Sequence, residues 1–265
     1  VRIPVALRSS LYGAFAWQYG IDVAEIRYPL DSYGTFNDFF CRTLRDDARP
    51  IANVPNGLVS PVDAKVMVHG VISGANARVE QVKGATYSVR AFLGFDPVEA
   101  AGASSTVQYV VLYLAPGDYH RIHSPCEVKF SQGRHFCGEL LPVRSWLLKR
   151  VNDIFAVNER VVLTGQWRFG QMNLVAVGAA NVGNIFLDFD PKLKTNRLRD
   201  IAVHNGGDVS NKLYPEGVSL PAGGSVGGFR LGSTVVLVFE TPSKFQWKVA
   251  PGDTVKVGQV LGEAL

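Results

Sequence analysis

Hydrophobic and polar positions along this chain follow the short-period pattern of β-strands over most of its length. Apolar runs rich in Val, Ile and Leu are separated by turns that contain Gly, Pro, Asp or Asn. The clearest runs cover residues 57–72, 79–89, 106–114, 156–165, 172–187 and 229–240. The segment APGD at 115–118 is typical of a turn. The pattern therefore predicts a mainly β protein.

Helical spacing is concentrated near the N-terminus. Residues 7–19 predict an amphipathic helix, and a second helix is predicted from Phe36 with Thr35 as its N-cap. Apolar positions of the first helix are Leu7, Leu11, Ala14 and Phe15, with Trp17 and Tyr19 nearby. Such a helix either covers a core or lies in a bilayer interface, and both interpretations stay open. We expect an N-terminal helical cap over residues 1–50 that associates with membranes.

Composition is consistent with a folded protein that buries a full core. The chain has 265 residues, of which 47% are hydrophobic and 19% charged, and no composition break marks a linker. We therefore expect one catalytic β-rich domain over residues 51–265. The expected fold class is α+β, mainly β: a hybrid barrel or sandwich with lipoyl-like hairpins. Residues 249–265, with the pattern G-D-x-V-K-x-G-Q-x-L, are expected to form the last hairpin.

Charge and cysteine content narrow the class of partner. The net charge of +4 suits an anionic membrane surface or acidic ligand, and the scattered basic residues argue against nucleic acid. Cys41, Cys126 and Cys137 share no CxxC spacing, so neither a zinc ribbon nor a disulfide framework is predicted. No apolar run reaches the ~18 residues of a transmembrane helix. Because the chain starts at Val1, we expect that an upstream targeting or membrane segment has been removed.

Candidate chemistry begins with two histidines in a turn region. The chain has five histidines: His69, His120, His123, His135 and His204. His120 and His123 lie together in LAPGDYHRIHSP, directly after a strong apolar run. Asp63, in SPVDAKV, is by itself typical of a turn at the entry to a strand. A carboxylate can also orient a histidine and stabilise its imidazolium form, if the two residues meet in the fold.

The pair Gly232–Ser233 begins the apolar run of 234–238 and permits two interpretations. A glycine bulge before a strand is the simpler one. A serine nucleophile elbow is disfavoured, because the residues after Ser233 predict a strand and not a helix. The Ser233 hydroxyl can instead attack the Gly232 carbonyl, which no side chain shields. Ester formation, β-elimination and hydrolysis would then leave a pyruvoyl group at position 233.

The chain resembles the phosphatidylserine decarboxylase family, whose members are pyruvoyl-dependent and make their own cofactor. Motifs in the same order carry the resemblance through nearly the whole chain. They are FNDFFCRTLRDDARPI, SPVDAKV, QVKGATYSV, YLAPGDYHRIHSP, NERVVL, VGAANVG and LGSTVVLVFE. YLAPGDYH, QVKGATYS and NERVVLTG are most similar to the mitochondrial branch. The resemblance implies attachment to the mitochondrial inner membrane on its intermembrane-space side.

The resemblance also implies a role for each candidate residue. Ser233 would become the pyruvoyl group, which forms a Schiff base with phosphatidylserine and yields phosphatidylethanolamine. Asp63 and His123 would act in self-cleavage and His120 in decarboxylation. Cleavage between Gly232 and Ser233 would give a β chain of residues 1–232 and an α chain of residues 233–265. Implied partners are phosphatidylserine, a membrane surface and the two cleaved chains, with no metal and no nucleic acid; a homo-oligomer is left open.

Two positions depart from the family pattern, and two other functions remain open. Ala64 stands where relatives commonly have Gly, and Pro142 stands where they often have a serine that assists protonation. Without that serine, protonation would fall to His120, water or another donor. The alternative functions are a zinc hydrolase that uses His120, His123 and Asp63, and a non-catalytic lipid-binding module.

Overall fold

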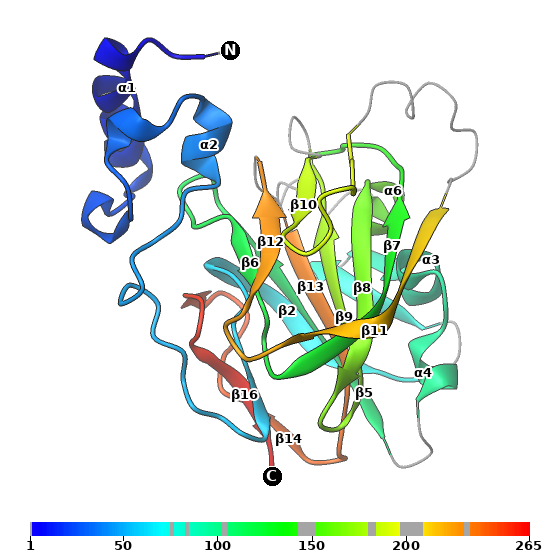
Figure 1. Cartoon of the computed structure of the whole chain (residues 1–265). Helices are drawn as coiled ribbons and strands as arrows, with labels where there is room; N and C mark the ends of the chain where they lie inside the picture. The colour runs from blue at the N-terminus through cyan, green and yellow to red at the C-terminus, as the bar shows by residue number, and fades with distance from the viewer. Residues whose placement is uncertain are drawn as a thin grey trace.

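A computed structural model describes residues 2–74, 77–82, 85–101, 105–142, 152–179, 184–196, 209–230 and 234–265. β-Strands are the main secondary structure of the described residues (Figure 1). Eight of these strands form one antiparallel sheet, which we call the central sheet. Its strands, in spatial order, are β11 (Val209–Leu220), β7 (Val128–Phe136), β8 (Arg160–Trp167), β9 (Gly170–Val177), β13 (Thr234–Thr241), β5 (Thr106–Tyr113), β2 (Ala64–Ile72) and β15 (Thr254–Val255).

Three smaller sheets complete the described strands. One contains β10 (Ile185–Leu187), β12 (Ser225–Phe229) and β6 (Arg121–His123) in the order β10–β12–β6. Another contains β1 (Gly57–Val59), β16 (Val260–Ala264) and β14 (Phe245–Trp247) in the order β1–β16–β14. The last pairs β3 (Arg78–Val82) with β4 (Ala85–Ser88). The described helices are α1 (Val5–Tyr19), α2 (Phe36–Phe40), α3 (Val89–Leu93), α4 (Pro97–Ala100), α6 (Ile154–Val157) and the 3-10 turns η1 (Val23–Glu25) and η2 (Leu30–Ser32).

The inner strands of the central sheet, such as β13 and β5, are buried on both faces, which explains why they are continuously apolar and do not alternate. One face packs against the β10–β12–β6 and β1–β16–β14 sheets through residues such as Leu112, Leu237 and Phe229. The other face packs against β3, β4, α3 and α6 through residues such as Val236 and Phe92. β13 therefore lies in the middle of the molecule, between β9 and β5.

The predicted fold class is confirmed at the level of a mainly β protein with a few helices. Within the described residues the central sheet ends at β11 on one side and at β15 on the other, so it is not closed into a barrel. The finer description as a hybrid barrel or sandwich with lipoyl-like hairpins stays a prediction. The predicted hairpin over 249–265 is wrong, because β15 pairs with β2 while β16 pairs with β1 and β14. A turn separates β15 from β16, but each of the two strands hydrogen-bonds to strands from other parts of the sequence.

The N-terminal segment has a small apolar core of its own. Tyr12 of α1 stacks on Phe39 of α2 with ring centroids 4.5 Å apart, and the Tyr12 hydroxyl donates to the Tyr33 carbonyl. Thr35 caps α2 with a full capping box, as predicted. Leu7, Leu11 and Trp17 point outward, and Trp17 is 85% exposed. This outward apolar side is retained in the folded chain, whereas Phe15 packs against α2.

Among the described helices, none is both long and apolar enough to cross a bilayer.

Candidate active site

The predicted scissile pair, Gly232–Ser233, lies outside the described residues. The described residues that border it are Arg230 and Thr234. Before it, the Arg230 amide donates to the Asn184 carbonyl at 3.0 Å, which continues the pairing of β12 with β10. After it, Thr234 starts β13 opposite Tyr113 of β5 and Val177 of β9. The chain thus leaves the β10–β12–β6 sheet at Arg230 and enters the central sheet at Thr234.

His120 lies directly beneath the end of β12. Its carbonyl accepts a hydrogen bond from the Phe229 amide at 3.0 Å, and its side chain is completely buried. Nδ1 lies 2.7 Å from the Asp118 carbonyl, which can only accept, so Nδ1 carries the proton. Nε2 is buried and has no hydrogen-bond partner within the described part of the chain. Burial lowers the pKa of His120 to about 3, so the ring is neutral and presents a free lone pair.

His123 is the last residue of β6, on the outer side of the β10–β12–β6 sheet, and both of its ring nitrogens form hydrogen bonds. Nδ1 donates to the Gly223 carbonyl at 2.8 Å, and Nε2 accepts from the Tyr119 hydroxyl at 3.1 Å. Burial lowers the pKa of His123 and raises that of Tyr119 to about 12, so the pair is a neutral hydrogen bond. The two histidines of the motif therefore differ, because one has a free ring nitrogen and the other has none.

Asp63 is brought to the neighbouring segment but does not hydrogen-bond to either histidine within the described structure. The His123 amide donates to the Pro61 carbonyl at 2.8 Å, so the two segments run side by side. The Asp63 carboxylate instead binds the Arg49 guanidinium through contacts of 2.6–3.1 Å and accepts the Val257 amide at 2.8 Å. Asp63 and His123 are still coupled electrostatically, since the Asp63 charge raises the pKa of His123 against the larger effect of burial.

Three consecutive residues, the last one of α2 and the two that follow it, contact the histidine segment. No role was predicted for any of them from the sequence. The Phe40 ring lies 4.0 Å from the His120 ring, centroid to centroid, and the Cys41 thiol donates to the Phe229 carbonyl at 2.9 Å. Arg42 is buried and donates to the carbonyls of Gly117 and Asp118 at 3.0 and 3.3 Å.

The Asp118 carbonyl that fixes the His120 ring is thus also held by Arg42. The signal available in the sequence was FNDFFCR, a polar residue at the end of a capped aromatic helix. This segment is part of a motif that carries the family resemblance, and the motif by itself assigns no role to Arg42.

The NERV motif, residues 158–161, holds backbone segments that come before and after it in the chain. The Asn158 side chain binds the Leu141 amide and carbonyl and the Gly178 carbonyl at 2.9–3.0 Å. Arg160 is buried and donates to four backbone carbonyls, and its desolvation lowers its pKa to about 9. Pro142 follows the residue that Asn158 holds, so the position that departs from the family pattern lies beside this support.

No group of three His, Cys, Asp or Glu side chains within the described ranges is arranged to hold a metal ion. Asp63 is occupied by Arg49, and both ring nitrogens of His123 are engaged. The zinc hydrolase alternative therefore gains no support from the geometry. The three cysteines are free thiols, in agreement with the absence of a predicted disulfide framework.

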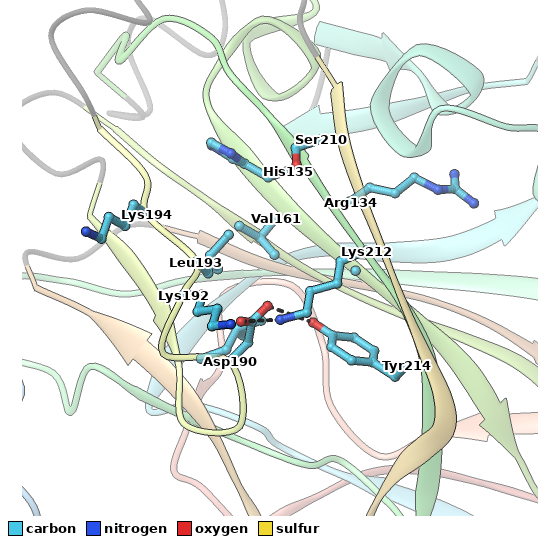
Figure 2. Close-up of a pocket in the computed structure, with 12 residues that line it drawn as sticks. Arg134, His135, Val161, Asp190, Lys192, Leu193, Lys194, Ser210, Lys212 and Tyr214 are labelled. Carbon is cyan, nitrogen blue, oxygen red and sulfur yellow. Dashed lines mark hydrogen bonds and ion pairs between the residues drawn. The ribbon is translucent and has the colours of Figure 1, made fainter.

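A well-formed cavity lies on a different part of the central sheet, between β7, β11 and the segment after β10 (Figure 2). Its volume is about 240 Å³. Asp190 on its wall is bound by Lys212 at 2.5 Å and by the Tyr214 hydroxyl at 3.3 Å, and His135 binds Glu159 at 2.8 Å. Asp63, His120 and His123, the predicted catalytic residues that the structure describes, do not line this cavity. The His120 segment is therefore the candidate proton-transfer site of this mainly β protein, because it holds an unused ring nitrogen.

Comparisons with known proteins agree with the motifs. The family model for phosphatidylserine decarboxylase matches residues 36–263. A "phosphatidylserine decarboxylase proenzyme 1, mitochondrial" of Toxoplasma gondii is 49% identical over 99% of this chain. The phosphatidylserine decarboxylase proenzyme of Plasmodium falciparum and the mitochondrial one of Rattus norvegicus are each 36% identical over 99% of this chain.

This chain belongs to the phosphatidylserine decarboxylase family. It spans 61% of the length of the Toxoplasma relative, 72% of the Plasmodium falciparum relative and 69% of the rat relative.

Proposed function

We propose that this protein is a phosphatidylserine decarboxylase that is made as a proenzyme and cuts itself between Gly232 and Ser233. The product of its reaction would be phosphatidylethanolamine. The observation that supports this most directly is the buried, neutral His120 with a free Nε2, beside the strand that enters the proposed cut. Membership of the family supplies the substrate.

The proposed self-cleavage uses groups of this chain alone. The Ser233 hydroxyl attacks the Gly232 carbonyl carbon, the peptide nitrogen leaves as an amine, and an ester joins the two residues. Loss of the α-proton of residue 233 then breaks the ester bond and releases a carboxylate at Gly232. The dehydroalanine at position 233 takes up water and loses ammonia, which leaves a pyruvoyl group.

Asp63 and His123 are proposed to assist the cut. Asp63 lies on the segment beside β6, and its carboxylate is held in place by hydrogen bonds from Arg49 and the Val257 amide. His123 is neutral and can serve as a base once its Nε2 is free of the Tyr119 hydroxyl. A shift of the Tyr119 side chain is therefore part of the proposal.

In decarboxylation, the pyruvoyl group would accept the electron pair of the carbon–carbon bond that breaks when carbon dioxide leaves. His120 fits the accompanying proton transfer. Its ring is held by the Asp118 carbonyl on one side and by the Phe40 ring on its face, so Nε2 is presented in one tautomer. As a neutral imidazole it first accepts a proton, for instance from the substrate ammonium, and then returns it to the carbon that has lost carbon dioxide.

We further propose that the outward apolar side of α1 contacts the membrane that holds the lipid substrate. Leu7, Leu11 and Trp17 are exposed there, and the net charge of +4 favours an anionic surface. By analogy with the mitochondrial relatives, the membrane would be the mitochondrial inner membrane, on its intermembrane-space side. A catalytic domain of 51–265 under a cap of 1–50 fits this arrangement.

Intact-mass spectrometry of the purified protein tests the function. Two fragments are expected, and the smaller is the last 33 residues, 233–265, with a carbonyl-bearing N-terminus. Ser233→Ala should remain whole and inactive, and release of carbon dioxide from phosphatidylserine should track the cut fraction. A wild-type chain that stays whole while it decarboxylates phosphatidylserine would contradict the proposed mechanism.

A further inference from the structure

Two arginines converge on one aromatic ring on the outer face of the β10–β12–β6 sheet. Phe186 pairs with Gly228, and Gly228 pairs with Arg121, so the three positions form one row across the sheet. The Arg121 guanidinium lies 5.6 Å from the centre of the Phe186 ring, and that of Arg230 lies 5.8 Å from it. The opposite face carries Ile122 and Phe229 into the core.

Gly228 makes room for this arrangement. A Cβ atom at that position would lie 3.0 Å from the edge of the Phe186 ring and 2.8 Å from the His120 carbonyl oxygen. The Phe186 ring therefore packs closely against the strand at Gly228, and Gly228 lies against the His120 carbonyl.

The charge of this group is not balanced within the described residues. Arg121 binds the Asp188 carboxylate at 2.5 Å and the Ser225 hydroxyl at 3.0 Å. Arg230 is exposed and has no acidic group within 4.0 Å in the described part of the chain. The nearby Cys41 thiol stays neutral, because burial raises its pKa to about 12. One carboxylate thus lies beside two guanidinium groups, and in the described structure it binds only that of Arg121. Arg230 remains an exposed cation whose guanidinium carries a rigid, planar set of donors.

The position of this cation relative to the proposed cut matches the chemistry of the substrate headgroup. Arg230 precedes Ser233 by three positions in the sequence, and α2 lies beside the ends of β6 and β12 (Figure 1). In phosphatidylserine only the two serine carbons and the ester oxygen separate the reactive amine from the phosphorus. A group that holds the phosphate must therefore lie close to residue 233.

We propose that Arg230, with Arg121 and the Phe186 ring, binds the phosphodiester of phosphatidylserine and so places its amine at residue 233. This inference rests on the proposed function and names the part of the substrate that is recognised. Arg230 supplies the free charge-assisted donors, and Phe186 holds its guanidinium in place. Arg121, fixed by Asp188, supplies a second cation 5.6 Å from the centre of the same ring.

Steady-state kinetics of the cut, full chain with a water-soluble short-chain phosphatidylserine tests the proposal away from any bilayer. Arg230→Gln should raise KM by about tenfold, equal to the loss of roughly one charge-assisted hydrogen bond, while kcat per pyruvoyl group changes by less than about twofold. Arg230→Lys should recover part of the loss. Inorganic phosphate should inhibit the wild type competitively and the Gln variant more weakly.

Arg168→Gln is the matched control, because Arg168 is also an exposed arginine over a phenylalanine ring, at 5.7 Å from the centre of Phe169. Its KM should equal that of the wild type. A KM of Arg230→Gln equal to that of the wild type would overturn the proposal. A defect seen only with phosphatidylserine vesicles would also overturn it, because it would assign Arg230 to attraction of the protein to the bilayer.

If Arg230→Gln fails to cut, Phe186→Leu decides, because it removes the ring and leaves the sequence at the cut unchanged. A raised KM supports the proposal and an unchanged KM contradicts it. A wild type that releases no carbon dioxide from either substrate contradicts the proposed function itself, and the inference with it.

Discussion

Two parts of this molecule place a histidine next to acidic or carbonyl groups, and they differ in what is left unsatisfied. The cavity of Figure 2 is open, but its histidine and its carboxylate are paired: His135 with Glu159, and Asp190 with Lys212. The His120 segment is buried, yet Nε2 of His120 has no partner among the described residues. A buried polar atom without a partner costs free energy, so its retention indicates use, whereas an open cavity with paired groups does not.

The largest expected effect separates these two histidines. His120→Ala should lower turnover by at least about a hundredfold, the usual contribution of a proton-transfer group, and leave the cut intact. His135→Ala should lower stability through the loss of its bond to Glu159 and leave turnover per cut chain close to that of the wild type. Carbon dioxide release, normalised to the cut fraction from intact mass, measures both. Equal losses in the two variants would remove the distinction drawn above.

The next effect concerns two of the buried carboxylates, Asp63 and Asp190. Asp63→Ala leaves the partly buried Arg49 with Glu25 as its remaining carboxylate partner in the described structure, which should lower the free energy of unfolding by about 3 kcal/mol and stop the cut. Asp190→Ala is the control, because Asp190 is equally buried and paired with Lys212. It should also destabilise the protein but allow the cut. Denaturant unfolding together with intact mass separates the two effects, and an uncut Asp190 variant would assign the block to misfolding.

Arg42 offers a smaller test of the segment that holds His120. Arg42→Gln should lower kcat by about tenfold, because the Asp118 carbonyl loses one of the groups that position it. The Arg42 charge also lowers the pKa of His120, so its removal should shift the acid limb of the kcat profile to higher pH. Arg134→Gln, which removes a half-buried arginine bound to the Leu93 carbonyl, should leave that limb in place. An unshifted limb in Arg42→Gln would contradict the coupling.

The pH dependence of stability gives a further measure of His120. Its folded pKa of about 3 lies below its unfolded value of 6.5, so the unfolded chain binds the extra proton and stability falls as pH drops through that window. Asp118 acts in the opposite direction between 3.8 and about 6, because burial raises its pKa. The difference between wild type and His120→Gln isolates the histidine, and it should change by up to ~1 kcal/mol per pH unit. A constant difference would argue against a buried neutral ring.

The smallest effect is expected in the cavity of Figure 2. Lys192→Gln removes an exposed charge from its rim and should change KM, kcat and the cut fraction by less than about twofold. Kinetics with vesicles and with soluble substrate should agree. A large loss in this variant would mean that the open cavity takes part in the reaction and that the comparison above favours the wrong region.

Much of the local structure followed from the sequence pattern. The run 106–114 became β5, the APGD segment became a turn with the Asp118 amide bound to the Ala115 carbonyl, and Thr35 capped α2. These features depend on neighbours within a few residues, so period and turn chemistry specify them. The pairing of β15 with β2 was not predicted, because a strand pattern gives the buried faces and leaves the partner open.

The candidate site divides in the same way. The sequence indicated His120, His123 and Asp63, and the motifs that contain them indicated the family. It gave no sign that Arg49 would occupy Asp63 or that Tyr119 would occupy His123. Those contacts join segments that are distant in the chain or face one another only after β6 has formed, so no spacing reports them.

By itself, the sequence determined the class of this protein: a mainly β chain with a capped aromatic helix near its start and the motifs of the phosphatidylserine decarboxylase family. Those properties reside in residue types and short spacings. Tertiary structure alone decided that the two histidines of one motif have different hydrogen bonding, and that Arg121 and Arg230 meet on Phe186. Sheet register sets both results, since it brings side chains from distant strands to one face and determines which ring nitrogen finds a partner.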